Sequence, residues 1–309
     1  MQPKGEIMKK LVFLFILVCL AIFSIFIIQH RKSTRLTMIQ TVLQDKLDTA
    51  VEKYQADNAI GIVINAKTGK IIAKYETSSE NAIFNKNFEF GHLTSVFNTV
   101  IAWENGISAD KSILLESKNA EQMKLATDLP EYAQSKFFDK IHFNDVLTVD
   151  SDTTVQPDLP TKWTKSEREK AGIGYGIKIT PIHLIYGLNA VVNDGLYVDS
   201  QNSGSKRVIS SENSSKIRDI MREIVETTVP NSTIQNIGIK TASIENSDKK
   251  AITTAVFATF PIENPEYSML VILDNPHATE STNGWKTASV NAVPLTGQIL
   301  TEIMPILEK

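Results

Sequence analysis

Cysteine is nearly absent from this sequence. Cys19 is the only one in 309 residues, so no disulfide can form within the chain. Basic charge is not in excess either, because 32 Lys and Arg residues are opposed by 35 Asp and Glu residues. Without a basic surface there is no reason to expect a nucleic-acid partner. The histidines show no metal-ligand spacing, so no metal site and no cofactor are expected. They are His30, His92, His142, His183 and His277.

One long hydrophobic run lies close to the N-terminus. Residues 11–28 read LVFLFILVCLAIFSIFII, in which Ser24 is the only polar side chain. As a helix, at ~1.5 Å per residue, the run would be roughly 27 Å long, about one hydrocarbon core. A cleaved signal peptide or a lipoprotein signal at Cys19 would be alternatives. However, the run is long for a signal peptide, no small-x-small cleavage site follows it, and apolar Val18 and Leu20 flank the cysteine. We therefore expect residues 1–35 to form a cytoplasmic tip and an uncleaved membrane anchor.

Charge alone does not orient this anchor. Basic residues stand on both sides of the apolar run, whereas a clear excess on one side would identify the cytoplasmic end. Those before the run are Lys4, Lys9 and Lys10, and those after it are Arg31, Lys32 and Arg35.

The remaining residues, 36–309, are expected to form one domain that begins with a helix and a hairpin. Apolar residues recur at helical spacing over residues 37–54. Residues 59–75, AIGIVINAKTGKIIAKY, contain two β-rich runs joined by a Lys-Thr-Gly turn, which is typical of a hairpin. Residues 94–103 predict a buried helix that ends at Asn105 and Gly106.

The second half of the domain predicts further helices and three strands. Thr180 and Pro181 fit the start of a helix that Gly195 would stop, and a second helix is expected over residues 211–225. Strands are expected over residues 237–243, 251–260 and 267–273, and a last helix follows. Residues 108–171 are polar and poorly periodic. This order indicates an α+β fold, with a mostly antiparallel sheet flanked by helices.

Several of these segments, in this order, resemble the transpeptidase domain of class B penicillin-binding proteins of the septal, cell-division type. FEFGHLTSVFNTVIAWENGI (residues 88–107) is similar to the family pattern Y-E-P-G-S-T-F-K-P and its L-E-N-G helix end. GYGIKITPIHL is similar to G-Y-G…T-P-x-Q-L, and IGIKTASIEN stands where the Lys-Thr-Gly strand belongs. MLVILDNPHA and SVNAVPLTGQIL resemble the last strand and helix. The resemblance implies the penicillin-binding transpeptidase fold, which serine β-lactamases share, in the bacterial inner membrane with the domain outside the cytoplasm.

The family's chemistry depends on three motifs, Ser-x-x-Lys, Ser-x-Asn and Lys-Thr-Gly. Its serine and lysine share a helix face, so the amine can take the hydroxyl proton. Aligned on this pattern, His92 stands at the nucleophile position and Ser95 at the lysine position. The ancestral activity is therefore expected to be lost, because residues that act as a unit lose nearly all catalysis when one is removed.

The other two motifs are also altered in this alignment. TVDSDTT offers Asp150 and Asp152 for the second motif, and the short interval from there to Gly174 predicts a shortened helical lobe. The third motif reads Lys240, Thr241 and Ala242, followed by Ser243. The resemblance implies that Lys240, Thr241 and Ser243 bind a ligand carboxylate or peptide end, while no residue is assigned as catalytic. The degenerate positions are His92, Ser95, Asp150, Asp152 and Ala242.

Three functional interpretations follow from these substitutions. The first is a membrane-anchored pseudoenzyme, a non-catalytic component of septal or cell-wall peptidoglycan synthesis, with other cell-division proteins and the peptidoglycan stem peptide as partners. The second is an acyl hydrolase or transferase in which Ser95 and His92 form a rebuilt triad with Asp150 or Asp152. The third is a non-covalent sensor of peptidoglycan peptides or β-lactams. Asp145 with Asp150 and Asp152 could bind a cation, but a solvated acidic loop is the simpler interpretation.

Overall fold

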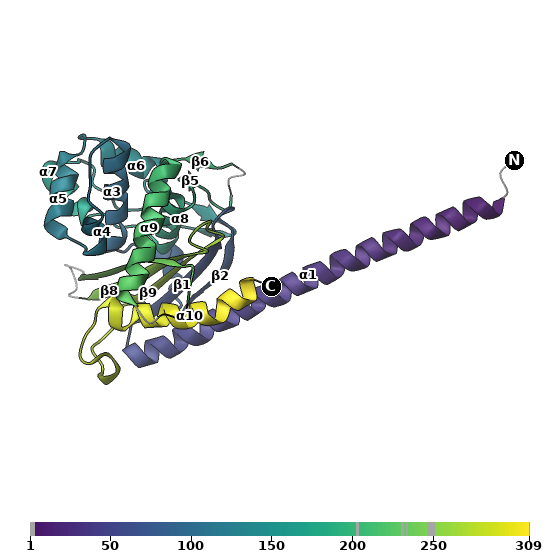
Figure 1. Cartoon of the computed structure of the whole chain (residues 1–309). Helices are drawn as coiled ribbons and strands as arrows, with labels where there is room; N and C mark the ends of the chain where they lie inside the picture. The colour runs from purple at the N-terminus through teal and green to yellow at the C-terminus, as the bar shows by residue number, and fades with distance from the viewer. Residues whose placement is uncertain (1–3, 202–203, 230–231, 233, 246–250, 309) are drawn as a thin grey trace.

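The computed structural model describes residues 4–201, 204–229, 232, 234–245 and 251–308, and for many positions in 4–28 only the backbone. It begins with one helix of 51 residues, α1 (Lys4–Tyr54), whose N-terminal part projects from the domain as a rod (Figure 1). Among the described residues no helix qualifies as a candidate membrane span, and many side chains of the predicted anchor lie outside the described residues. The helix predicted over residues 37–54 is the C-terminal part of α1, which packs against the domain.

A five-stranded antiparallel sheet forms the centre of the domain, in the order β2-β1-β9-β8-β7. The predicted hairpin is confirmed as β1 (Asn58–Asn65) and β2 (Ile71–Glu76), and the three C-terminal strands as β7 (Gly238–Glu245), β8 (Ile252–Phe260) and β9 (Tyr267–Asp274). β1, β8 and β9 are apolar along almost their whole length because helices cover both of their faces. β2 and β7 are the edges, and β7 carries the Lys-Thr-Ala sequence.

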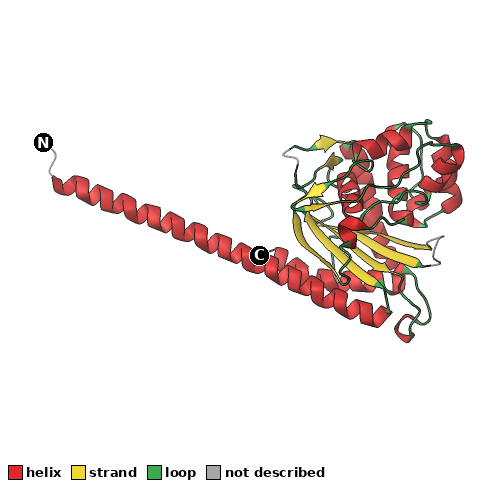
Figure 2. Ribbon diagram, turned by 180° about the vertical axis from the view of Figure 1, so that it is seen from behind, coloured by secondary structure: helices red, strands yellow, loops and turns green. Residues whose placement is uncertain are grey.

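Helices lie on both sides of this sheet (Figures 1 and 2). α1 and the last helix, α10 (Ala292–Leu307), pack side by side on one face. α8 (Pro181–Val192) and α9 (Ser211–Thr228) pack on the other. The packing of α1 is close: a Cβ atom added at Gly61 of β1 would lie 2.6 Å from the Leu43 Cδ1 atom. This three-layer arrangement confirms the predicted α+β class and leaves the edge strand β7 open toward a helical lobe.

The helical lobe combines the predicted helix of residues 94–103 with helices from the poorly periodic residues 108–171. It contains α3 (Ser95–Glu104), α4 (Ser112–Leu115), α5 (Asn119–Asp128), α6 (Ala133–Lys140) and α7 (Lys165–Gly172). Its core combines phenylalanine rings packed edge to face with a buried amide network, in which the Asn98 side chain bonds to Gln122 and Gln134. Short helices with buried amides give little apolar periodicity, so residues 108–171 showed no clear pattern.

Short elements complete the domain. They are α2 (Ala82–Asn85), the 3-10 turns η1 (Gly91–Leu93), η2 (Glu280–Thr282) and η3 (Ala288–Val290), and two small hairpins, β3 (Thr148–Val149) with β4 (Asp152–Thr153) and β5 (Leu196–Tyr197) with β6 (Lys206–Arg207). The turn η1 lies immediately before α3 and against β7, so it brings His92 to the junction of sheet and lobe.

Candidate functional site

The turn that carries His92 is held in place by the loop GIGYG, which comprises residues 172–176. Gly174 has φ +82°, and a Cβ atom there would lie only 2.1 Å from the Gly91 carbonyl oxygen. The Gly176 N–H donates to Glu89 Oε1 at 2.7 Å, and Phe88 and Ile179 form a bridge. The loop therefore holds the segment immediately before His92, and the close approach to Gly91 explains why glycine is needed at position 174.

The His92 imidazole is mostly withdrawn from solvent. Its Nδ1 atom is buried and has no hydrogen-bond partner among the described residues. Burial and, to a smaller extent, the nearby Lys240 charge together lower the pKa of His92 to about 4. At neutral pH the imidazole is therefore uncharged. The nucleophile position thus holds a neutral base beside a cation.

Ser95 is not arranged as a nucleophile. Its side chain is 1% exposed, and its hydroxyl donates to the His92 carbonyl oxygen at 2.8 Å. A hydroxyl that bonds to the preceding turn of its own helix does not donate to the imidazole of His92, as a Ser-His pair requires. His92 and Ser95 are neighbours across one turn, but the hydrogen bond from the Ser95 hydroxyl to the His92 imidazole that a rebuilt triad needs is not observed.

Lys240 of β7 is buried beneath the helical lobe. It is 3% exposed, and its Nζ atom donates to the Leu114 carbonyl oxygen at 2.6 Å and to Ser117 Oγ at 3.2 Å. Burial lowers the pKa of this amine to about 8. Both contacts direct the amine toward the lobe, and the ligand-binding role that the resemblance implied for Lys240 stays a prediction.

The contact with Ser117 corrects the position of the second motif. Ser117, Lys118 and Asn119 have the Ser-x-Asn spacing, and they lie at the start of α5, whose first residue is Asn119, with Ser117 at φ +52°. We infer that this tripeptide, and not Asp150 and Asp152, occupies the second-motif position. A signal was present in the sequence, because SKNAEQMKLA places the tripeptide at a helix start, but no long-range contact could be read from it.

Asp150 and Asp152 lie in a different part of the molecule. They belong to the hairpin of β3 and β4, where Asp150 is an exposed turn residue and Asp152 forms an ion pair with Lys74 of β2. Neither residue can orient His92 from there, which removes the third member of the rebuilt triad. The prediction of a shortened lobe loses its basis too. It rested on the short interval between Asp152 and Gly174, which applies only if Asp152 belongs to the second motif.

The proposed cation-binding role of the acidic residues gains no support. Asp145 forms an ion pair with His142 at 2.7 Å. Over the described ranges, no cluster of three or more His, Cys, Asp or Glu side chains is arranged to hold a metal ion.

The pleat of β7 separates the third-motif residues onto two faces. Ala242 is 4% exposed and shares the buried face with Lys240 and Ile244, toward the turn of His92. Thr241 is half-buried on the opposite face, where Ser243 is exposed and its Oγ accepts from the Ala288 N–H at 2.8 Å. The extra methyl group of Ala242 therefore lies on the buried face of the strand, which Ile244 turns toward Gly91, and not on the face of Thr241 and Ser243.

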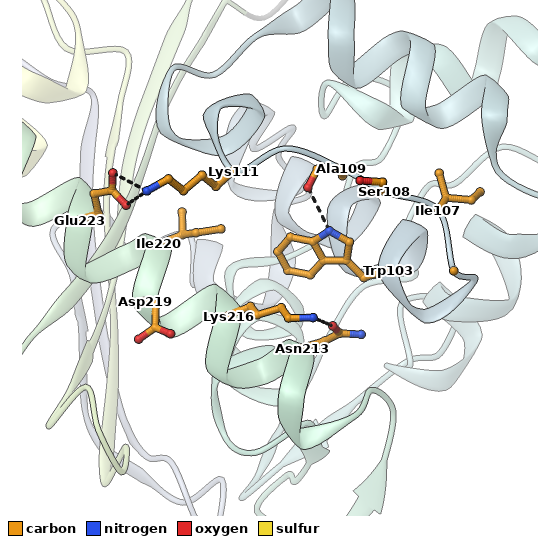
Figure 3. A pocket seen from close by; sticks show the side chains of 11 residues that line it. Trp103, Ile107, Ser108, Ala109, Lys111, Asn213, Lys216, Asp219, Ile220 and Glu223 are labelled. Atoms are coloured by element: carbon orange, nitrogen blue, oxygen red, sulfur yellow. Dashed lines mark hydrogen bonds and ion pairs between the residues drawn. The ribbon is translucent and has the colours of Figure 1, made fainter.

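A separate pocket of about 570 Å³ lies between the end of α3 and α9 (Figure 3). The Trp103 indole forms one wall and donates to the Ala109 carbonyl oxygen at 3.2 Å. Lys111 and Glu223 form an ion pair at 2.8 Å at one end, and Lys216 lies at the other. None of the motif residues lines this pocket, so it is distinct from the site at Lys240.

The buried histidines predict a pH-dependent stability. His183 is 0% exposed, and burial lowers its pKa to about 4, as it does for His92. Its ring bonds to Thr180 Oγ1 at 2.7 Å and the Asp145 carbonyl oxygen at 2.9 Å. The unfolded chain binds protons below pH ~6.5 and the folded chain does not until about pH 4, so stability falls as pH falls through this window. We expect His183 alone to account for on the order of 3 kcal/mol.

Denaturant unfolding between pH 4 and 7 measures this effect. His183→Gln should flatten the dependence, while His277→Gln, which replaces an exposed histidine, serves as the matched control. Equal slopes for both variants would contradict the assignment to His183.

Comparison with known proteins identifies a family and several relatives of this chain. The family model for the penicillin binding protein transpeptidase domain matches residues 111–293. The probable peptidoglycan D,D-transpeptidase FtsI of Caulobacter vibrioides is 23% identical over 340 residues, which cover 87% of this chain and 57% of the relative. Stage V sporulation protein D of Bacillus subtilis is 23% identical over 345 residues, covering 87% and 52%. The chain thus spans about half the length of the curated relatives that it matches.

Solved structures share the fold. The transpeptidase domain of Burkholderia pseudomallei penicillin-binding protein 3 superposes with a TM-score of 0.77 at 18% identity, covering 88% of this chain and 95% of that one. The transpeptidase domain of FtsI4 from Legionella pneumophila gives a TM-score of 0.72 at 17% identity, covering 86% and 96%. The fold and the resemblance predicted from the sequence motifs are thereby confirmed.

Proposed function

Because this chain belongs to the penicillin-binding protein transpeptidase family, we propose that it is a pseudoenzyme of peptidoglycan synthesis. In this proposal it is a non-catalytic component of the septal or cell-wall apparatus, and it contacts other cell-division or cell-wall proteins and the peptidoglycan stem peptide. Relatives named as peptidoglycan D,D-transpeptidases support the peptidoglycan setting.

The replacements in the first motif are the observation that supports the non-catalytic part of the proposal. An acyl-enzyme needs a hydroxyl or thiol that an adjacent base can deprotonate. His92 offers a neutral imidazole at the nucleophile position, and Ser95 replaces the lysine base. The Ser95 hydroxyl is buried and donates to a backbone carbonyl oxygen. The nucleophile and its base are therefore both replaced. The other two motifs keep their residue types at Ser117, Asn119, Lys240 and Thr241.

The two alternatives make different demands on the same residues. An acyl hydrolase or transferase would require the Ser95 hydroxyl to turn from the His92 carbonyl oxygen to the imidazole. A non-covalent sensor would require Lys240 to leave Leu114 and bind a ligand carboxylate. The first change breaks one hydrogen bond of a 1% exposed side chain, and the second opens a buried amine.

A fluorophosphonate probe and a fluorescent penicillin test these proposals together. Covalent labelling that disappears in Ser95→Ala would support the hydrolase or transferase. Saturable, reversible penicillin binding would support the sensor. The pseudoenzyme proposal requires that neither covalent labelling nor reversible penicillin binding is detected.

We further propose that residues 1–35 anchor the chain in the bacterial inner membrane as a single pass, with residues 36–309 outside the cytoplasm. The N-terminal half of α1 leaves the domain (Figure 2). Bulky apolar side chains on it are exposed. They include Phe13, Phe15, Ile16, Leu20, Phe23 and Phe26. Exposed apolar residues in such a contiguous run call for a lipid or protein environment.

Full-length protein is accordingly expected in the membrane fraction, with its N-terminus intact and the domain accessible to a protease added from outside. The anchor's apolar side chains stabilise this state because their transfer into hydrocarbon is favourable. Fractionation followed by N-terminal sequencing measures it, and a chain lacking residues 1–35 is the soluble control. A mature chain that begins after Ile28 would rule the anchor out.

A further inference from the structure

In Figure 1 the end of α10 lies beside α1 where α1 leaves the domain. Residues of both helices line a pocket of about 650 Å³ at this place. Its polar side is basic: Arg31, Lys32 and Arg35 come from α1, and Lys70 comes from the turn between β1 and β2. No Asp or Glu lines the pocket. Within the described part of the chain none of these four side chains forms an ion pair, so their charge is not neutralised by the protein.

The other side of the pocket is apolar. Leu36 and Ile39 of α1, Ile71 of β2 and the α10 residues Ile306 and Leu307 line it. Glu266 and Glu308 line a separate cavity of about 100 Å³ that shares only Tyr267 and Leu307 with this one. The pocket therefore offers cations and an aliphatic wall together, which suits a ligand with an anionic head and an apolar chain.

The position of the pocket along α1 points to the same kind of ligand. Arg31 and Arg35 follow the last residue of the apolar run, Ile28, within two helical turns of the same continuous helix. At ~1.5 Å per residue they lie roughly 5–10 Å beyond the hydrocarbon boundary. The headgroup layer extends roughly 5–8 Å on each side of the core, so these cations are at the depth of lipid phosphates.

The orientation of the chain makes these cations unusual. With residues 36–309 outside the cytoplasm, Arg31, Lys32 and Arg35 stand on the side of the membrane where Lys and Arg are ordinarily depleted. Unpaired basic residues there work against the orientation of the anchor. A ligand that neutralises them offsets this cost.

We propose that this pocket binds the phosphate headgroup of an anionic membrane lipid in the leaflet that faces the domain. The phosphate lies among Arg31, Lys32, Arg35 and Lys70, and the lipid chain lies along Leu36, Ile306 and Leu307. Lys70 belongs to the turn between β1 and β2 while the arginines belong to α1, so one lipid bridges the anchor and the domain. The inference rests on the membrane anchoring proposed above.

Full-length protein in neutral phosphatidylcholine nanodiscs provides the test. A fluorescent phosphatidylglycerol is titrated in, and binding is measured by native mass spectrometry or by fluorescence quenching. Arg35→Gln/Lys70→Gln is compared with Lys124→Gln/Lys162→Gln, a charge-matched control pair of exposed lysines in or near the helical lobe. Since each basic residue near an anionic surface contributes appreciably, we expect the pocket variant to lose roughly tenfold or more in affinity while the control variant does not.

Other outcomes overturn the proposal. Equal losses in both variants would mean that net charge and not the pocket attracts the lipid. Displacement by inorganic phosphate at comparable concentration would assign the pocket to the free ion. Stable insertion of the protein without preference for phosphatidylglycerol would refute the lipid site and leave the anchor intact, whereas failure to insert would refute the anchor and the lipid site with it.

Discussion

Full-length protein incubated with a fluorescent penicillin is expected to form no adduct that survives denaturing electrophoresis. The covalent bond would require a hydroxyl at position 92, where a neutral imidazole stands, and a base at position 95, where a buried serine stands. In a well-studied serine protease, loss of the nucleophile or of its base lowers turnover by roughly 10⁶-fold. An active transpeptidase domain labelled in parallel is the positive control. A stable band that disappears in Ser95→Ala would contradict the pseudoenzyme proposal.

Restoring variants separate the loss of the first motif from a wider change of the site. His92→Ser/Ser95→Lys returns the reacting pair, and adding Ala242→Gly removes a methyl group from the buried face of β7 beside the lobe. Because Ser117, Asn119, Lys240 and Thr241 are present, we expect the triple variant to be acylated faster than the double variant. Exchanging Asp150 and Asp152 is expected to change nothing, since both lie in the β3–β4 hairpin. A double variant that reacts like an ordinary family member would show that Ala242 does not disturb the site.

Gly174→Ala is expected to destabilise the domain by roughly 3–5 kcal/mol or to prevent folding. The new Cβ atom would lie 2.1 Å from the Gly91 carbonyl oxygen, and backbone cannot move aside as a flexible side chain can. The positive φ adds a smaller penalty, about 1–2 kcal/mol for a non-glycine residue. Denaturant unfolding of wild type and variant measures the total.

Gly284→Ala is the matched control, because Gly284 has nearly the same φ, +79°, but has no atom within 4 Å of the added Cβ. It is expected to lose only the conformational penalty of about 1–2 kcal/mol. The difference between the two variants therefore isolates the contact that holds the His92 turn. Equal losses would mean that this contact is not needed.

The elements of the sheet were predictable because their signals are local. β1 and β2 have apolar, β-rich runs on either side of a turn, and β8 and β9 are long apolar strands, so residue order alone identifies them. α8 begins at Pro181 as predicted, although the Thr180 hydroxyl bonds to His183 instead of capping the helix. The lobe helix α3 was predicted as well, but α4 to α7 were not, because phenylalanine clusters and buried amides stabilise the lobe through tertiary contacts.

The replacement of the nucleophile by His92 and of its base by Ser95 was determined by the sequence itself, because both positions lie in one uninterrupted segment with a recognisable helix end. The partner of Lys240 was decided only by the tertiary structure. Ser117 lies 123 residues before Lys240, and two acidic residues at Ser-x-Asn spacing competed with it in the sequence. The same holds for Ala242, whose methyl group could point to either side of β7 until packing against the His92 turn fixed the pleat. Contacts between distant segments depend on the geometry of the whole chain, and no local pattern carries that information.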